Sequence, residues 1–148
     1  MESIDLLERF TAQSAAFERA FIDDDWSRLE PYFTPDAIYE TLGPGGERWV
    51  GSPAVMAALR RAVNNFDRRC DSRALVTIEG PVRDGAEVLR QWSCTFTLSG
   101  APDLTIDGSE RAVYRGELIE LLQEKLTAPS REELGRWVAA HGSLLRRR

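Results

Sequence analysis

The chain has 148 residues, of which 43% are hydrophobic and 29% charged, and 19 basic against 24 acidic residues give a formal net charge of −5. These values are typical of one globular domain with a single core. The acidic balance disfavours nucleic acid and anionic membranes as partners. No apolar run in the sequence reaches the roughly 18 residues that a membrane span needs. The two cysteines form no disulfide framework, so we expect a cytoplasmic protein.

The first half of the chain is predicted to be mainly helical. Apolar residues recur at helical spacing over residues 4–21, and three aspartates follow at 23–25. One of these aspartates is a suitable N-cap for a second, short helix over residues 26–33. A short strand is expected over residues 37–42, and a third helix from about residue 53 to residue 70.

The second half of the chain changes to the period of β-strands. Strands are predicted over residues 73–79, 86–98, 104–114 and 117–126, and a last helix begins near Pro129. This order predicts an α+β fold. Three N-terminal helices pack on a strongly bent antiparallel sheet and enclose a cone, and one helix follows at the C-terminus.

Arg90 is the most informative single residue. It shares one face of the 86–98 strand with apolar residues, and a buried guanidinium is costly unless an acid accompanies it. A structural salt bridge, or a place at the rim of the cone, explains it. A role as anchor for a carboxylate or an enolate is the alternative explanation.

Two acids on the 104–114 strand are the candidate partners or catalysts. In a regular strand Asp107 and Glu110 point to opposite faces, so only one of them lines the cone unless a bulge forms at Gly108. An acid paired with Arg90 is structural. An unpaired acid in an apolar cone can donate or accept a proton near neutral pH.

Several aromatic residues are expected in the core or on the wall of the cone: Trp26, Tyr39, Trp49 and Trp92. Tyr39 can also donate a hydrogen bond to a ligand. The single histidine, His141, argues against a metal site and against acid–base pairs that use histidine. We therefore expect no metal and no cofactor.

A longer pattern resembles a known superfamily. It consists of Asp25-Trp26, Leu29, Tyr32-Phe33, Pro35-Asp36-Ala37 before a strand, and then Gly51, Ala54-Val55 and Leu59. This order is similar to the nuclear transport factor 2-like superfamily, which includes SnoaL-like polyketide cyclases, ketosteroid isomerases and limonene epoxide hydrolases. The resemblance implies one SnoaL-like domain over residues 1–148, with a core at about 4–128 and a helical extension at about 129–148. It also implies a small apolar or carbonyl-containing ligand and a homodimer packed through the sheet.

The functional positions of the relatives are only partly kept. The position of the isomerase base falls at Thr41, that of the isomerase tyrosine at Phe17, and that of the protonated aspartate near Asp107. Limonene epoxide hydrolases use an arginine bracketed by two aspartates. Arg90 matches that arginine, but Trp92 replaces one acid and the other falls near Gln123.

Three functions remain open after this comparison: acid–base catalysis on a carbonyl-containing substrate, of the cyclase, isomerase or hydratase type; ligand binding without chemistry; and a dimerisation module with a filled cone. The candidate catalytic residues are Asp107, Glu110 and Arg90. The candidate ligand-binding residues are Tyr39, Trp26, Trp92, Phe17, Phe96 and Gln123.

Overall fold

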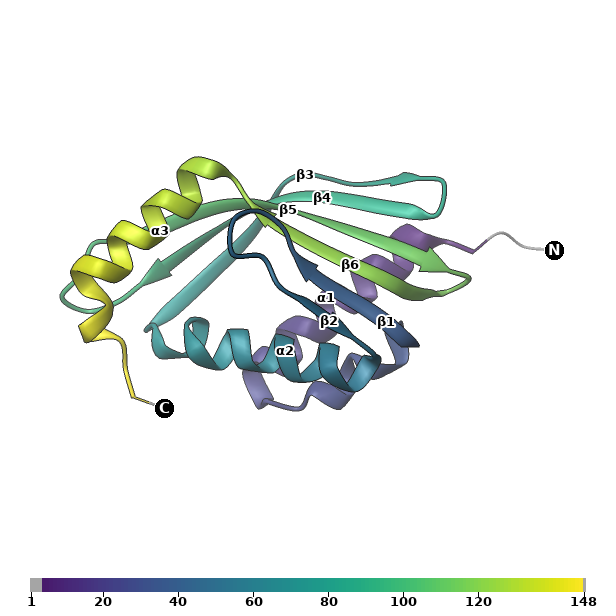
Figure 1. The fold of residues 1–148 in the computed structure, drawn as a ribbon, viewed down its shortest axis with the longest axis horizontal. Coiled ribbons are helices and arrows are strands. Elements are labelled where there is room, and N and C mark those ends of the chain that lie inside the picture. The colour runs from purple at the N-terminus through teal and green to yellow at the C-terminus, as the bar shows by residue number, and fades with distance from the viewer. Residues whose placement is uncertain (1–3, 148) are drawn as a thin grey trace.

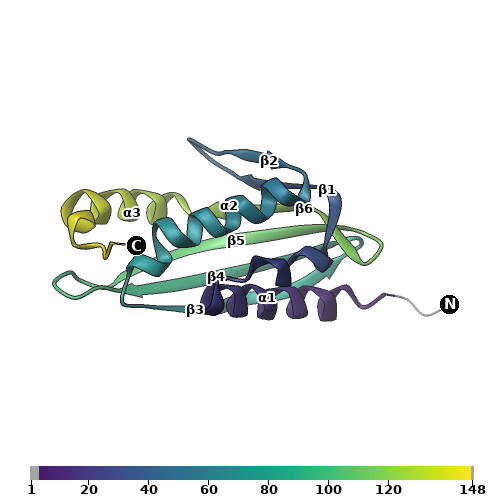
Figure 2. The same ribbon diagram turned by 90° about the horizontal axis from the view of Figure 1, so that it is seen from below.

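The computed structural model describes residues 4–147 and shows helices on one face of a curved six-stranded sheet (Figure 1). In chain order the elements are α1 (Leu6–Asp23), η1 (Trp26–Arg28), η2 (Glu30–Tyr32), β1 (Phe33–Thr41), β2 (Arg48–Val50), α2 (Ser52–Asn65), η3 (Asp67–Arg69), β3 (Ser72–Asp84), β4 (Glu87–Thr97), β5 (Leu104–Arg115), β6 (Leu118–Leu126), α3 (Ala128–His141) and η4 (Gly142–Leu144). Helix α1 packs against β3 and β4, and α2 packs against β1 (Figure 2).

The sheet confirms the predicted α+β class and differs from the prediction in detail. Its strand order is β2-β1-β6-β5-β4-β3. Strands β3 to β6 pair antiparallel as expected, but β1 runs parallel to β6, so the sheet is mixed. The helix expected at residues 26–33 consists of the two 3₁₀ turns η1 and η2. Two α-helices within residues 4–147 therefore precede the long strands, where three had been predicted.

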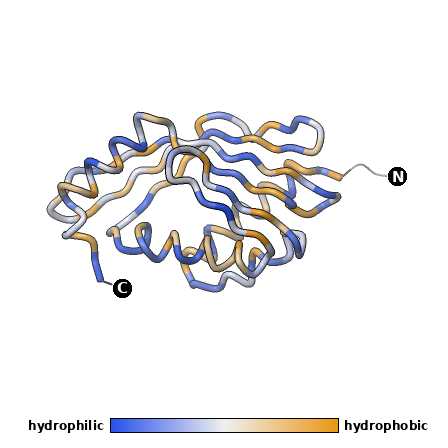
Figure 3. The backbone as a smooth tube through the Cα atoms, viewed as in Figure 1, coloured by the Kyte–Doolittle hydropathy of each residue, from blue (hydrophilic) through white to orange (hydrophobic). Residues whose placement is uncertain are grey.

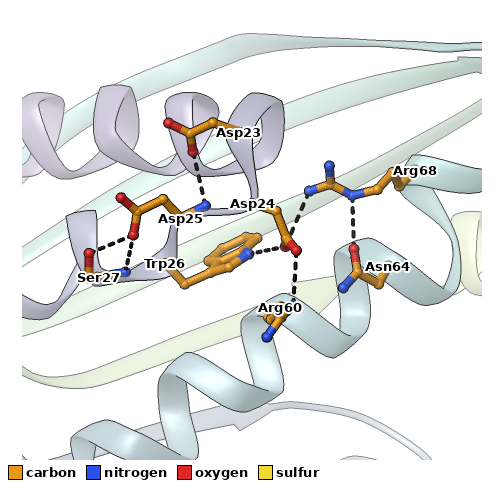
Figure 4. Close-up of polar contacts among 8 residues, drawn as sticks. All are labelled: Asp23, Asp24, Asp25, Trp26, Ser27, Arg60, Asn64 and Arg68. Atoms are coloured by element: carbon orange, nitrogen blue, oxygen red, sulfur yellow. Dashed lines mark hydrogen bonds and ion pairs between the residues drawn. The ribbon is translucent and has the colours of Figure 1, made fainter.

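The three consecutive aspartates build the corner between α1 and η1 (Figure 4). Asp24 ends α1 in the left-handed conformation, with φ 60°, and accepts hydrogen bonds from Trp26 Nε1 and Arg60 Nη2, both at 2.9 Å. Asp25 caps η1 by accepting from the Ser27 amide. The triplet thus ties α1 to α2. Within residues 4–147 no group of three or more acidic, histidine or cysteine side chains is arranged to hold a metal ion.

The core consists of two clusters that follow the curvature of the sheet. Apolar and polar residues alternate along the strands, so one face of the sheet is available to the helices (Figure 3). The larger cluster lies under α1 and α2 and includes Phe10, Leu29, Val55, Ile119 and Leu122. The smaller cluster lies under α3 and includes Cys94, Phe96, Leu104, Ile106 and Trp137. None of the helices within residues 4–147 has an apolar stretch long enough to cross a membrane.

Helix α3 is held in place by an N-terminal cap and by a buried tryptophan. The Thr127 hydroxyl caps its N-terminus by accepting from the Ser130 amide at 3.2 Å. Farther along, the Trp137 indole is 3% exposed and donates to the Pro102 carbonyl at 2.9 Å. The helix therefore lies across the end of β5, where it forms one wall of the cone.

Candidate functional site

A cavity of about 850 Å³ lies between the inner face of the sheet and the helices. Small-molecule sites usually measure about 300–1,000 Å³, so this volume suits a ligand. The wall comes from α1, α2, β1, β3 to β6 and α3. Exposed residues of the β1–β2 loop (42–46) and exposed Lys125 also line it, so the cavity meets solvent there.

Three ionisable side chains stand in a row on the inner face of adjacent strands. Arg90 on β4 is paired in register with Glu110 on β5, and Glu110 is paired with Glu124 on β6. Such neighbours across strands lie close enough for their side chains to interact. Arg90 Nη2 donates to Glu110 Oε1 at 3.0 Å, with both side chains largely buried. We call Arg90, Glu110 and Glu124 the acid row.

Tyr39 extends the acid row onto β1. Its hydroxyl donates to Glu124 Oε2 at 3.2 Å, and its ring stacks on Trp49 with 5.2 Å between the ring centres. Burial, followed by the charge of Glu124, raises the pKa of Tyr39 well above its ordinary value, so this side chain stays a phenol and a donor.

Glu124 is the most perturbed carboxyl group of the row. Its pKa is raised from 4.5 to about 8, first by burial and then by the charge of Glu110 and a hydrogen bond with it. The Tyr39 hydrogen bond and the charge of Arg90 act in the opposite direction. At neutral pH the row therefore holds a protonated carboxyl group beside the carboxylate that is paired with Arg90.

The Arg90 guanidinium has one hydrogen-bond donor without a partner among the described residues. Its Nε is buried and has no hydrogen-bond partner in the described part of the chain. Its guanidinium carbon lies 5.4 Å from the centre of the Phe10 ring. A buried, unpaired donor beside a protonated acid can stabilise negative charge that develops on a ligand oxygen.

A second polar cluster lines the same cavity between α1, η3 and β3. Arg73, 7% exposed, forms ion pairs with Glu18 Oε2 at 2.7 Å and Asp67 Oδ2 at 3.0 Å. Burial raises the pKa of Asp67 against the charge of Arg73, which lowers it. Sequence analysis did not identify this cluster, because its three residues come from three separate elements.

The structure separates the three residues that were predicted to be catalytic. Arg90 and Glu110 line the cavity and contact each other. The β4–β5 register continues through Gly108, so Asp107 faces the other side of the sheet and does not line the cavity. The backbone of Asp107 instead binds α3, because its amide donates to Ser130 Oγ at 2.8 Å.

The residues predicted to bind the ligand divide in the same way. Four of them line the cavity: Tyr39, Trp92, Phe17 and Phe96. Trp26 is instead 6% exposed in the core next to Asp24. Gln123 lies on the outer face of β6, where it accepts from Arg111 at 2.9 Å and donates to Glu40 at 2.8 Å.

Glu124 is the important residue that the sequence analysis missed. The resemblance to epoxide hydrolases had placed the position of an acid near Gln123, which is the residue before Glu124. The signal was present in the strand period, because Glu124 alternates with Leu122 and Leu126, which also line the cavity.

Cys94 also lines the cavity, but as an inert group. Burial, the largest effect, raises the pKa of its thiol to about 11. A thiol in this state is not a nucleophile at neutral pH.

Comparison with known proteins identifies the fold independently. A family model of the SnoaL-like domain matches residues 14–121. An LEH-like epoxide hydrolase of M. tuberculosis is 18% identical, with a TM-score of 0.63, and the match covers 93% of this chain and 97% of that one. An NTF2-like protein of unknown function from Burkholderia pseudomallei is 13% identical, with a TM-score of 0.65 and coverage of 88% and 97%. A protein with a ketosteroid isomerase-like fold from Catenulispora acidiphila, solved with trimethylamine, is 18% identical, with a TM-score of 0.60 and coverage of 80% and 87%.

No curated protein sequence matches the chain. The solved structures named above are distant in sequence, so they establish the fold and leave the chemistry to the site itself. The family model covers most of the chain. The protein therefore belongs to the SnoaL-like domain family, within the nuclear transport factor 2-like superfamily that its sequence resembles.

Proposed function

We propose that the protein is an acid–base catalyst that moves a proton on a small, mostly apolar molecule with a carbonyl group. The observation that carries this proposal is the pKa of Glu124, about 8, beside the carboxylate of Glu110 in a cavity of ligand size. A protonated acid next to an acid that is paired with an arginine supplies a proton donor and a proton acceptor together.

The proposed mechanism assigns one role to each group. The protonated Glu124 donates a hydrogen bond to the carbonyl oxygen. The carboxylate of Glu110 removes a proton from the neighbouring carbon, and Arg90 Nε stabilises the charge that develops on the oxygen. Return of the proton to a different carbon completes an isomerisation. Tyr39 acts as a positioning residue through its hydrogen bond to Glu124.

Hydration of an epoxide is the second candidate. The same row offers an acid for the ring oxygen and a carboxylate that can activate water. The likeness to an LEH-like epoxide hydrolase supports this candidate. It is ranked second because the cavity wall is mainly apolar and aromatic.

Two probes test these candidates. The first is cyclohex-3-enone, whose double-bond migration is followed by ultraviolet absorbance, and the second is cyclohexene oxide, whose diol is quantified by gas chromatography. Glu124→Gln and Glu110→Gln should each lower the turnover that is observed by about 10²–10⁴-fold. Glu120→Gln is the matched control, because Glu120 lies on the same strand but pairs with Arg115 at the surface.

Full activity in Glu124→Gln would refute the catalytic proposal. Binding of both probes without turnover of either would favour the alternative, in which the cavity holds a ligand and performs no chemistry.

We further propose that two copies associate through the outer face of the sheet. Val76, Ile78 and Val82 on β3 are each more than half exposed, and Leu89 opposite Val82 continues the apolar surface. Sedimentation should show a dimer that Ile78→Glu dissociates. Val50→Glu, on the opposite edge strand, is the control. A monomer in the unmodified protein would refute this association.

A further inference from the structure

The second polar cluster of the cavity contains more acids than its one arginine can neutralise. Glu18 and Asp67 share Arg73, whereas Glu110 is paired with Arg90 and the neighbouring Glu124 is protonated at neutral pH. The end of the cavity at Arg73 therefore carries an excess of negative charge and of hydrogen-bond acceptors.

A further acceptor lies between the two clusters. Gln13 on α1 is 3% exposed and lines the cavity, and its Oε1 has no hydrogen-bond donor in the part of the chain that the structure describes. Buried acceptors without donors are costly, so a group that supplies a donor is expected at this position.

The two arginines show that the polar clusters lie at separate places along the cavity. Arg90 lies over the Phe10 ring, at 5.4 Å, whereas Arg73 lies nearest to the Phe21 ring, at 4.8 Å from its centre. Phe10 and Phe21 lie on different turns of α1, so the clusters face different parts of this helix. The Trp92 ring lines the wall along the same strand face as Arg90.

We propose that the ligand carries a hydrogen-bond-donating group, an amine or a hydroxyl, at the end remote from its reacting oxygen, and that Glu18, Asp67 and Gln13 hold this group while excluding carboxylates. The orientation of this ligand rests on the proposed function, which places the reacting oxygen at Glu124. The end group itself follows from the charges and the unpaired acceptor alone.

A matched series of acetophenones tests the proposal. Four probes carry an ethyl, hydroxyethyl, aminoethyl or carboxymethyl group para to the acetyl group, and their dissociation constants are measured by isothermal titration calorimetry. The hydroxyethyl or the aminoethyl probe should bind at least about tenfold more tightly than the ethyl probe, because hydrogen bonds to charged groups have this strength. The carboxymethyl probe should bind more weakly than the ethyl probe.

Substitutions in the second polar cluster test whether that cluster causes the tighter binding of the hydroxyethyl or aminoethyl probe. Asp67→Asn and Glu18→Gln should each remove most of the gain. Asp71→Asn should retain it, because Asp71 is exposed and lies outside the cavity. Glu18 is 42% exposed, so Glu18→Gln keeps the test valid if Asp67→Asn fails to fold.

The outcomes separate this inference from the proposed function. Equal binding of all four probes, or no binding of any, overturns the inference. Tightest binding of the carboxymethyl probe, abolished in Arg131→Ala, overturns it in favour of anion binding at the mouth. Turnover of the earlier probes that depends on Glu124 would still support the proposed function in each of these cases. A clear amine or hydroxyl preference without turnover would leave the inference standing and refute the catalysis.

Discussion

Replacement of Glu124 by glutamine changes the pH dependence of stability in a way that the structure specifies. The pKa of Glu124 is about 8 in the folded protein and 4.5 as its ordinary value. Between these pH values the folded chain holds a proton that the unfolded chain has released. Stability is therefore highest at low pH and decreases as the pH rises through this window.

The size of the decrease follows from the two pKa values. At about 1.4 kcal/mol for each pKa unit, the difference corresponds to at most on the order of 5 kcal/mol between pH 4.5 and pH 8. Glutamine has the shape of the protonated acid and can keep both partners, since its carbonyl accepts from Tyr39 and its amide donates to Glu110. Glu124→Gln should match the unmodified protein near pH 5 and exceed its free energy of unfolding by several kcal/mol near pH 9.

The assay is urea unfolding followed by tryptophan fluorescence at each pH from 5 to 9. Titrating groups that do not interact with Glu124 contribute equally to both proteins and cancel in the difference. Glu120→Gln serves as control and should give a curve parallel to that of the unmodified protein. A parallel curve for Glu124→Gln would show that Glu124 is ionised at neutral pH and would refute the reasoning.

Three further predictions concern stability and are measured by urea unfolding at pH 7. Arg90→Ala leaves Glu110 buried without its partner and should cost about 3–5 kcal/mol; a loss below 1 kcal/mol would show that water replaces the guanidinium. Gly108→Ala places a Cβ 2.5 Å from the Trp92 ring and should cost about 1–3 kcal/mol, so an unchanged midpoint would contradict the close packing. Asp25→Ala removes the cap of η1 and should lower the free energy of unfolding by about 1 kcal/mol. An unchanged free energy of unfolding would show that the cap does not stabilise the protein.

The long elements could be predicted because their apolar periods are clear. Residues that are far apart in sequence but buried on one side of α1, such as Phe10 and Ala20, have helical spacing, and the alternation along β4 and β5 is regular. The shorter elements could not be predicted. β2 has only three residues, Arg48–Val50. It forms because it pairs with β1, and its own composition does not indicate a strand. The parallel pairing of β1 with β6 joins segments about eighty residues apart, so no local signal reveals it.

The site was only partly predictable for a related reason. The face on which a side chain lies depends on strand register, and the regular β4–β5 pairing places Glu110 inside and Asp107 outside. The face of β6 follows from its own strand period, which places Glu124 on the inner side with Leu122 and Leu126. Glu124 and Asp67 acquire their raised pKa values only through burial, which no residue pattern expresses directly.

The rim and the acid row belong to different segments of the chain. Arg90, Glu110 and Glu124 are fixed on central strands, whereas the β1–β2 loop and α3 form the wall near the opening. Insertions or deletions in the loop would therefore alter which molecules can enter without displacing the ionisable groups. Such a division lets evolution, or a protein engineer, change ligand range and chemistry one at a time.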